Sequence, residues 1–129
     1  MNPSTRKTCG LAVVAIALSL GVAACAKPPI DEPIPIKVVV VSMFEIGEDE
    51  GDRAGEFQLW KERQALTERF EMPAAHHDLF LNPETGVLGM VTGVGTARAA
   101  ASTMAVGLDA RFDLSRAYWL IVGIAGFFF

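Results

Sequence analysis

The residues best suited to chemistry lie in a glycine turn, Gly93-Val94-Gly95-Thr96, which joins an apolar run to an alanine-rich segment. A strand that turns through glycines into a helix leaves backbone N–H groups directed at one point, and the helix dipole adds partial positive charge there. The turn therefore suits phosphate or another anion, and Arg98 falls in the first helical turn, where its charge could contribute. Because Arg98 stands where G-x-G-x-x-G requires a third glycine, a purely architectural turn is the alternative interpretation.

A second glycine turn, Gly123-Ile124-Ala125-Gly126, follows another apolar run near the end of the chain. Open α/β sheets bind their ligands beyond the carboxyl ends of the strands. Two glycine turns that follow strands would both lie at that edge. Together they favour a ligand site more than either turn does alone.

Acidic and histidine side chains supply further candidates. Glu45 follows a run of valines at the same expected edge, where it could be a polar contact or a catalytic acid. The acids at 48–52 could bind a hard cation, but their spacing does not match an EF-hand loop, which favours a solvated acidic loop. His76 and His77 could ligate a metal, but neighbours on a strand point to opposite faces, so ordinary structural histidines are favoured. We expect no metal, and no cofactor beyond phosphate as a co-substrate.

Hydrophobic periodicity predicts the elements that must position these residues. The apolar run at 36–42 contains four consecutive valines and predicts a strand buried on both faces. Leucines and aromatic residues recur at helical spacing over 54–70, so we expect a helix there that ends before Pro73. Strands are predicted at 76–81 and 87–92, paired as a hairpin through the turn chemistry of 82–86.

A second helix is expected from Thr96, as its N-cap, to about Gly107. Its small side chains would allow close packing on a sheet, and the residues expected to share one face are Ala97, Ala101, Met104 and Leu108. A last buried strand is expected within 117–126. The order strand, helix, strand, strand, helix, strand predicts an α/β domain.

The carboxyl end of the sequence suggests an incomplete domain. The final strand and glycine turn lead to three phenylalanines at the point where an α/β protein would continue with a covering helix. We therefore expect a truncated domain whose sheet has an open edge and exposed apolar side chains, which invites self-association. The side chains expected to be exposed are Leu120, Ile121, Val122, Phe127, Phe128 and Phe129.

Composition excludes two broad classes. The 129 residues are 51% apolar and 20% charged, unlike a disordered polar chain, and their length corresponds to about one domain. Eleven lysine and arginine residues against fifteen acids give a net charge of −4. Because there is no basic field to attract phosphates, we expect no nucleic-acid partner.

The amino terminus has the order of an export signal. Arg6 and Lys7 precede an apolar run at 11–20 and a small-residue segment that ends at Cys25. The segment Val-Ala-Ala-Cys resembles a bacterial lipobox, which predicts a signal peptide at 1–24 and a lipid on Cys25. Cleavage after Ala26 and a retained signal anchor are the alternatives, in that order.

Cleavage before Cys25 would leave nine bases against fifteen acids, a net charge of −6 on an acidic exported protein. Residues 25–35 hold four prolines and predict an extended tether, with the domain following at 36–129. The lipid would anchor the protein on the periplasmic side of a bacterial envelope membrane. Under the alternative cleavage it would be periplasmic or secreted.

Three segments of the chain together resemble the purine nucleoside permease family. They are the run from Pro35 through the valines to Glu45, the Gly93–Arg98 turn and the apolar run from Ala117 to Gly126. That family is similar in turn to nucleoside phosphorylases and nucleosidases, in which a G-x-G turn before an alanine-rich helix and a later strand ending in G-x-A-G line the nucleoside site. The resemblance covers about three quarters of this chain and about the first third of the family's usual length.

The resemblance implies a three-layer αβα domain with a mixed sheet and a purine nucleoside as the ligand. Glu45 is the nearest match to the acid that follows the first strand of nucleosidases, and the family's later purine-contacting residues would fall beyond Phe129. The residues implied to line the nucleoside site are Gly93, Val94, Gly95, Thr96, Arg98, Gly123, Ala125 and Gly126.

These observations support two hypotheses about function. The first is a lipid-anchored protein that binds purine nucleosides for uptake or processing, with a phosphorylase or nucleosidase reaction as its enzymatic form. The second is a non-catalytic envelope lipoprotein with a phosphorylase-like fold and an unrelated partner. We expect the fragment to be inactive alone.

Replacing Cys25 with serine should release the protein from the membrane fraction, because serine cannot carry the acyl chains. Stable anchoring generally takes two lipid signals, and three acyl chains exceed that requirement. Fractionation of cells that express the chain or the variant, followed by immunoblotting, measures the change. Unchanged membrane association of the variant would contradict the lipid anchor.

Overall fold

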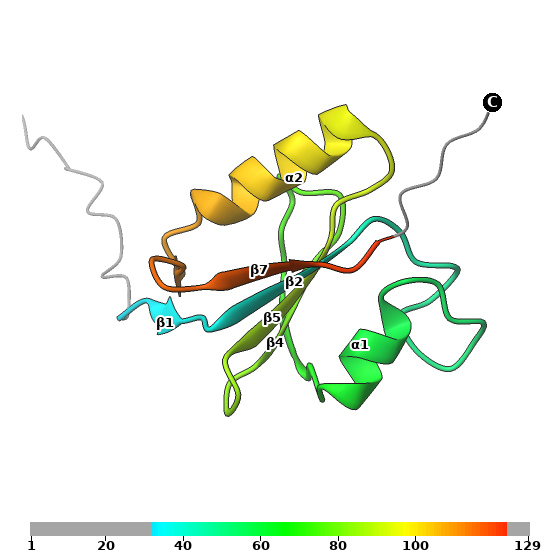
Figure 1. The fold of residues 1–129 in the computed structure, drawn as a ribbon, viewed down its shortest axis with the longest axis horizontal. Helices are drawn as coiled ribbons and strands as arrows, with labels where there is room; N and C mark the ends of the chain where they lie inside the picture. Colours follow the sequence, from blue (N-terminus) through cyan, green and yellow to red (C-terminus); the bar gives the residue numbers. More distant parts are fainter. Residues whose placement is uncertain (1–31, 124–129) are drawn as a thin grey trace, which may run out of the picture.

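A five-stranded mixed sheet forms the centre of the computed structural model, which describes residues 32–123 (Figure 1). Two helices and a separate two-stranded sheet complete the described part. The strands of the large sheet are β2 (Val38–Ser42), β3 (Glu68–Phe70), β4 (Leu79–Asn82), β5 (Val87–Val91) and β7 (Tyr118–Ile121). The helices are α1 (Gln58–Arg63) and α2 (Thr96–Gly107), and the small sheet pairs β1 (Ile34–Pro35) with β6 (Phe112–Asp113). The expected α/β class is confirmed.

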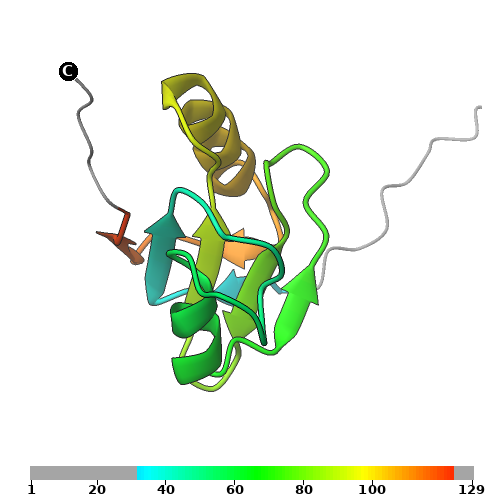
Figure 2. The same ribbon diagram turned by 90° about the vertical axis from the view of Figure 1, so that its right-hand side faces the viewer.

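Strand β2 is the central parallel strand of this sheet. The order is β3-β4-β5-β2-β7, and β2 pairs in parallel with both β5 and β7 (Figure 2). Strand β4 runs antiparallel to both of its neighbours, β5 and β3. Residues 39–42 of β2 are buried, as predicted for an unbroken valine run between two covered faces. The hairpin predicted between β4 and β5 is also confirmed.

The two helices cover opposite faces of the sheet, which makes three layers (Figure 1). On one face, Val39, Leu88 and Met90 are buried in a cluster that includes Val106 of α2. On the other face, Phe57 and other residues around α1 form a second cluster with side chains of β4 and β5. Because successive strand residues point to opposite faces, β4 and β5 contribute alternately to the two clusters.

Gly89 in β5 leaves the space that the second cluster needs. A Cβ atom at this position would lie 2.6 Å from Cε2 of Phe57 and 2.7 Å from Cδ1 of Leu66. Both side chains are almost completely buried, at 0% and 1% exposure. The missing side chain therefore lets an aromatic ring and a leucine pack directly on the backbone of the sheet.

The helix predicted over 54–70 is wrong in its extent. Helix α1 has only six residues, and Ala65 just beyond it has a φ of 48°, in the left-handed region. Asn82 Nδ2 donates to the carbonyl of Gln64 at 2.8 Å, which binds the chain after α1 to the end of β4. The chain then continues as β3, whose pairing with β4 replaces the last turns of the expected helix.

Helix α2 has the predicted bounds but presents a different face to the sheet. Gly95, not Thr96, is the N-cap, and Ser102 and Val106 are the buried residues of the helix. Met104 and Leu108, expected on the packed face, are 59% and 76% exposed. The hydroxyl of Ser102 decides the orientation, because it donates to the carbonyl of Thr92 at 3.0 Å and accepts the N–H of His76 at 3.0 Å.

Two strand predictions also differ from the structure. The strand expected at 76–81 begins only at Leu79, and the segment before it turns. Strand β7 is an exposed edge strand and not a buried one, because its other side has no neighbour among the described residues. Leu120 and Ile121 are 44% and 69% exposed, which confirms the exposure expected of these two residues.

The predicted tether and the two chain ends are described only in part. Ile34 and Pro35, placed in the tether by the sequence, form β1 and pair with β6. The predicted signal peptide, Cys25, Ala125, Gly126 and the terminal phenylalanines lie outside the described residues. Within residues 32–123, neither helix combines the length and apolar character needed to span a membrane.

Replacing Gly89 with alanine should lower the free energy of unfolding by about 1–3 kcal/mol, because Phe57 and Leu66 must shift to admit the methyl group. Urea denaturation followed by circular dichroism measures the change. Gly107→Ala is the matched control, since a Cβ there meets nothing within 4 Å and the residue ends α2. The control should be neutral or stabilising by up to about 1 kcal/mol. Equal effects of the two substitutions would contradict the packing argument.

Candidate functional site

Three parallel strands end at the same edge of the sheet, and the predicted site residues follow them. In the strand register, Ser42 of β2 lies opposite Val91 of β5, and Val41 lies opposite Ile121 of β7. The loop that contains Glu45, the turn that contains Gly93 and the residue Gly123 therefore begin side by side. The structure brings these sequence-predicted residues to one place, which we call the carboxyl edge.

The glycine turn at 93–95 has the backbone geometry that glycine permits. Gly93 and Gly95 have φ values of 80° and 96°, in a region that other residues rarely adopt. Helix α2 starts at Thr96 without a side-chain cap. The N–H groups of the first turn of a helix have no partner within it, so this turn presents donors to whatever lies beyond the edge. Val94, between the glycines, is 67% exposed.

His76 and Arg98 lie closely over the turn. A Cβ atom on Gly93 would come within 2.8 Å of Cγ of His76 and 3.0 Å of Cδ of Arg98. Arg98 is exposed, so its charge is near the turn but remains in solvent. The sequence pointed to Arg98 but gave His76 no role at this turn. Its place here depends on the bond from its N–H to Ser102 of α2.

Met43 connects the two glycine turns across the carboxyl edge. Its sulfur lies 3.3 Å from the hydroxyl oxygen of Thr92. On its other side, a Cβ atom on Gly123 would lie 2.6 Å from Cγ of Met43 and 3.0 Å from Oε2 of Glu56. The absence of a side chain at Gly123 thus leaves room for the methionine and for a carboxylate. The other residues of the second turn, at 124–126, lie outside the described range.

Glu45 closes a loop instead of facing open space. Its carboxylate accepts four backbone N–H groups, from Ile46, Gly55, Phe57 and Gln58. Partial burial raises the pKa of Glu45, but these four bonds outweigh it and hold the pKa below its ordinary value. An ionised carboxylate with four donors is poorly suited to donate a proton at neutral pH. Its bonds join both ends of residues 46–55, which we call the acidic loop, to the start of α1.

Glu56 is the acid that the sequence analysis missed at this edge. Oε2 of Glu56 accepts the backbone N–H of Met43 at 2.8 Å, next to the end of β2. The residue lies eleven positions after Glu45 and carries no motif of its own. It returns to the carboxyl edge only because Glu45 draws the two ends of the acidic loop together. A sequence pattern could not have shown that closure.

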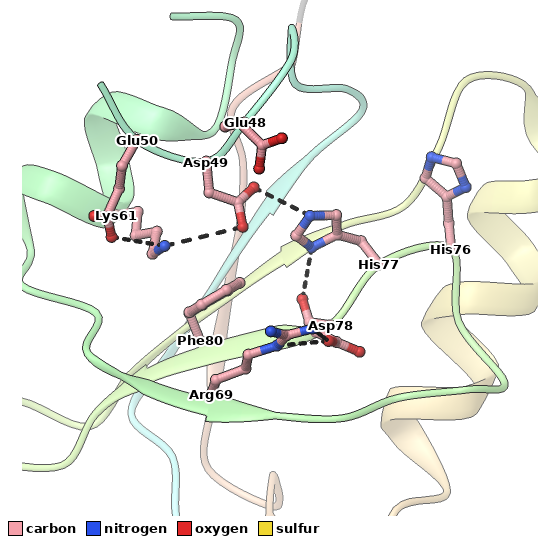
Figure 3. A pocket seen from close by; sticks show the side chains of 9 residues that line it. All are labelled: Glu48, Asp49, Glu50, Lys61, Arg69, His76, His77, Asp78 and Phe80. Atoms are coloured by element: carbon pink, nitrogen blue, oxygen red, sulfur yellow. Dashed lines mark hydrogen bonds and ion pairs between the residues drawn. The ribbon is translucent and has the colours of Figure 1, made fainter. Parts of the chain in front are cut away.

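The acidic loop is folded onto the sheet and is not simply a solvated segment. Asp49 has a side-chain exposure of 18% and contacts Lys61 of α1 and His77. His77 turns toward this loop, whereas His76 points away from it (Figure 3). Among the described residues there is no group of three histidine, cysteine or acidic side chains arranged to hold a metal ion.

A comparison with protein-family models gives a match that includes the whole carboxyl edge. The model described as purine nucleoside permease (NUP) matches residues 35–128. The chain belongs to the purine nucleoside permease family. The matched segment runs from β1 through both glycine turns and therefore spans every strand that ends at the edge. No curated protein and no solved structure gives a significant match to the chain.

Replacing Glu45 with glutamine should lower the free energy of unfolding of this protein by about 1–3 kcal/mol at pH 7. The amide lacks the negative charge and sets an NH₂ group against the backbone N–H donors. The folded pKa of Glu45 lies below its ordinary value of 4.5. The stabilisation is therefore complete well above pH 4.5 and is lost as the pH falls through the folded pKa. Urea denaturation at several pH values measures the difference between the two proteins.

The matched control for this experiment is Glu84→Gln, since Glu84 is an exposed acid in the turn between β4 and β5. It should change stability by less than about 0.5 kcal/mol at every pH. A Glu45 variant that matches wild type at pH 7, or a difference that grows toward low pH, would show that the four hydrogen bonds do not stabilise the fold.

Proposed function

We propose that this chain is an exported lipoprotein that binds purine nucleosides at the carboxyl edge for uptake or processing. The observation that carries the proposal is the meeting of the Gly93–Gly95 turn, Met43, Glu56 and Gly123 at the ends of three parallel strands. Membership of the purine nucleoside permease family supplies the ligand class. The edge of a parallel sheet is also where α/β proteins bind small molecules.

The groups at the edge match the chemistry of a nucleoside. First-turn N–H groups of α2 can donate to a ribose oxygen or to phosphate. The Glu56 carboxylate is an acceptor for a hydroxyl group and lies beside Gly123. Met43 offers an apolar, polarisable surface between the two turns. Gly95, where a Cβ atom would meet nothing within 4 Å, lets a ligand approach the backbone without meeting a side chain.

A phosphorylase or nucleosidase reaction is the second candidate function. It is favoured by the combination of a carboxylate, Glu56, with an anion-binding helix start near Arg98 at one edge. With phosphate as co-substrate the products would be a base and a sugar phosphate, and with water they would be a base and free ribose. A carrier would leave the nucleoside intact. The third alternative is an envelope lipoprotein without nucleoside binding.

Cellular location forms the remaining part of the proposal. The basic, apolar and small-residue order of the amino terminus supports export, and Cys25 supports a lipid anchor on the periplasmic side of the membrane. A short proline-rich segment would then hold the domain close to that surface.

Changing the glycine that corresponds to Gly95 into valine should weaken nucleoside binding at least tenfold in a longer family member that carries the same turn and the later purine-contacting residues. The substituted side chain strains a backbone with a φ of 96° and crowds the edge. Calorimetric titration with inosine measures the affinity, and circular dichroism checks the fold. The glycine that corresponds to Gly51 is the matched control, because its φ is 81° and its surroundings are equally open.

Chromatography of the same mixtures separates the remaining alternatives. Intact inosine indicates a binding protein, whereas hypoxanthine with ribose or ribose phosphate indicates an enzyme. If the Gly95 variant keeps its affinity for inosine, the turn is architectural and the proposed site is wrong. If neither protein binds any purine nucleoside, the non-catalytic lipoprotein replaces this proposal.

A further inference from the structure

A second cluster of charged groups lies beside the carboxyl edge, in a cleft of about 790 Å³ between the acidic loop, α1 and β4 (Figure 3). The charges in this cleft pair with one another. Lys61 Nζ lies 2.7 Å from Glu50 Oε1, Arg69 Nε lies 2.7 Å from Asp78 Oδ2, and His77 Nε2 lies 3.1 Å from Asp49 Oδ1. Because the polar groups satisfy each other, the cleft acts as a junction that holds the acidic loop to the sheet.

His77 differs from the other members of this junction because both of its ring nitrogens face acceptors. Nδ1 lies 2.8 Å from the backbone carbonyl of Asp78, and a carbonyl oxygen can only accept. This contact is a hydrogen bond only when Nδ1 carries a hydrogen. Nε2 faces the carboxylate of Asp49, which also accepts when it is ionised. Both contacts are hydrogen bonds only when the ring is the doubly protonated imidazolium.

A neutral His77 ring cannot make both hydrogen bonds, because it carries only one hydrogen on its two nitrogens. If Nδ1 keeps its hydrogen for Asp78, Nε2 presents a lone pair to the Asp49 carboxylate, and the contact becomes repulsive. Phe57 and Phe80 pack against the ring, each with its centroid 6.0 Å away, and limit its rotation on that side. The loss of one proton therefore removes one of the two hydrogen bonds and, in either tautomer, the positive charge that the ring holds against the Asp49 carboxylate.

The charged groups that face His77 come from every element packed against it, and histidine side chains generally titrate between about pH 5 and 8. From the acidic loop they are Glu48, Asp49 and Glu50, from α1 Lys61, from β3 Arg69, and from its own segment Asp78. The N–H of Met72 and then Arg69 hold the pKa of Asp78 below its ordinary value.

We propose that His77 is a pH-sensitive latch for the acidic loop: the imidazolium holds Asp49 to the segment before β4, and deprotonation loosens the tip of the loop. The two ends of the loop stay fixed, because Glu45 binds the N–H groups of Ile46 and Gly55 at any pH at which its carboxylate is ionised. The contacts of Lys61 with the loop do not depend on histidine. The released state is therefore a loosened tip and not an unfolded domain. This inference does not depend on nucleoside binding.

Hydrogen–deuterium exchange of the full chain at pH 5.5 and 8.5 tests the latch. After correction for intrinsic exchange, protection of peptides within 46–55 should fall about three- to tenfold between the two values, as expected for the loss of one charge-assisted bond near the surface. Peptides from α2, at 96–107, should keep their protection and thereby report an intact fold. Equal protection of the loop at both pH values would overturn the proposal.

Three variants make the assignment specific. Asp49→Asn, which keeps the side-chain shape, and His77→Gln should each remove the pH dependence and leave the loop at the lower protection. His76→Gln is the matched control, because His76 points away from the loop, and it should keep the wild-type dependence. If His77→Gln retains the pH dependence, or if His76→Gln loses it, a different group controls the loop and the proposal is wrong.

Discussion

The carboxylate of Glu45 is the interaction on which the carboxyl edge depends. It gathers N–H groups from residues that lie one to thirteen positions further along the chain, and so closes the acidic loop. With the loop closed, Glu56 can bind the N–H of Met43, and Met43 can lie between the two glycine turns. The Glu45 carboxylate can satisfy four N–H donors at once because its two oxygens together offer about four lone pairs.

The carboxyl edge also requires a central strand that can pair with a strand on each side and pack against a layer on each face. Strand β2 is flanked in parallel by β5 and β7 and is covered by a helix layer on each face. Valines meet this requirement, since they are apolar on both faces and favour extended backbone. The carboxyl edge exists because these three strands point the same way. On the face that carries Phe57 and Leu66, the absence of a side chain at Gly89 lets both residues pack directly on the sheet.

Much of this framework was predictable from local signals. The valine run indicated β2, the turn closed by Gly86 indicated the β4–β5 hairpin, and the glycines before Thr96 indicated the start of α2. Each of these signals acts over a few residues. Gly86, for example, adopts a φ of 73° that few other residues would accept.

The features that escaped prediction depend on contacts between distant segments. Residues 68–70 have spacing compatible with a helix, and only pairing with β4 makes them a strand. Helix α2 has small residues around its circumference, so apolar spacing alone could not identify its packed face, which the hydroxyl of Ser102 determines. Glu56 and the Asp49–His77 contact likewise follow from the closure of the acidic loop. This closure joins residues that are too far apart in the sequence for a local pattern to show it.

The pairing of β1 with β6 has a mechanical consequence. The chain enters the large sheet only after Ile34 and Ile36 have donated hydrogen bonds to Arg111 and Asp113, at 2.9 and 3.0 Å. Tension applied to the chain ahead of Glu32 therefore loads this two-residue parallel pair before it reaches β2. Because this pair contains only two residues on each strand, we expect it to open under tension before the longer strands of the large sheet.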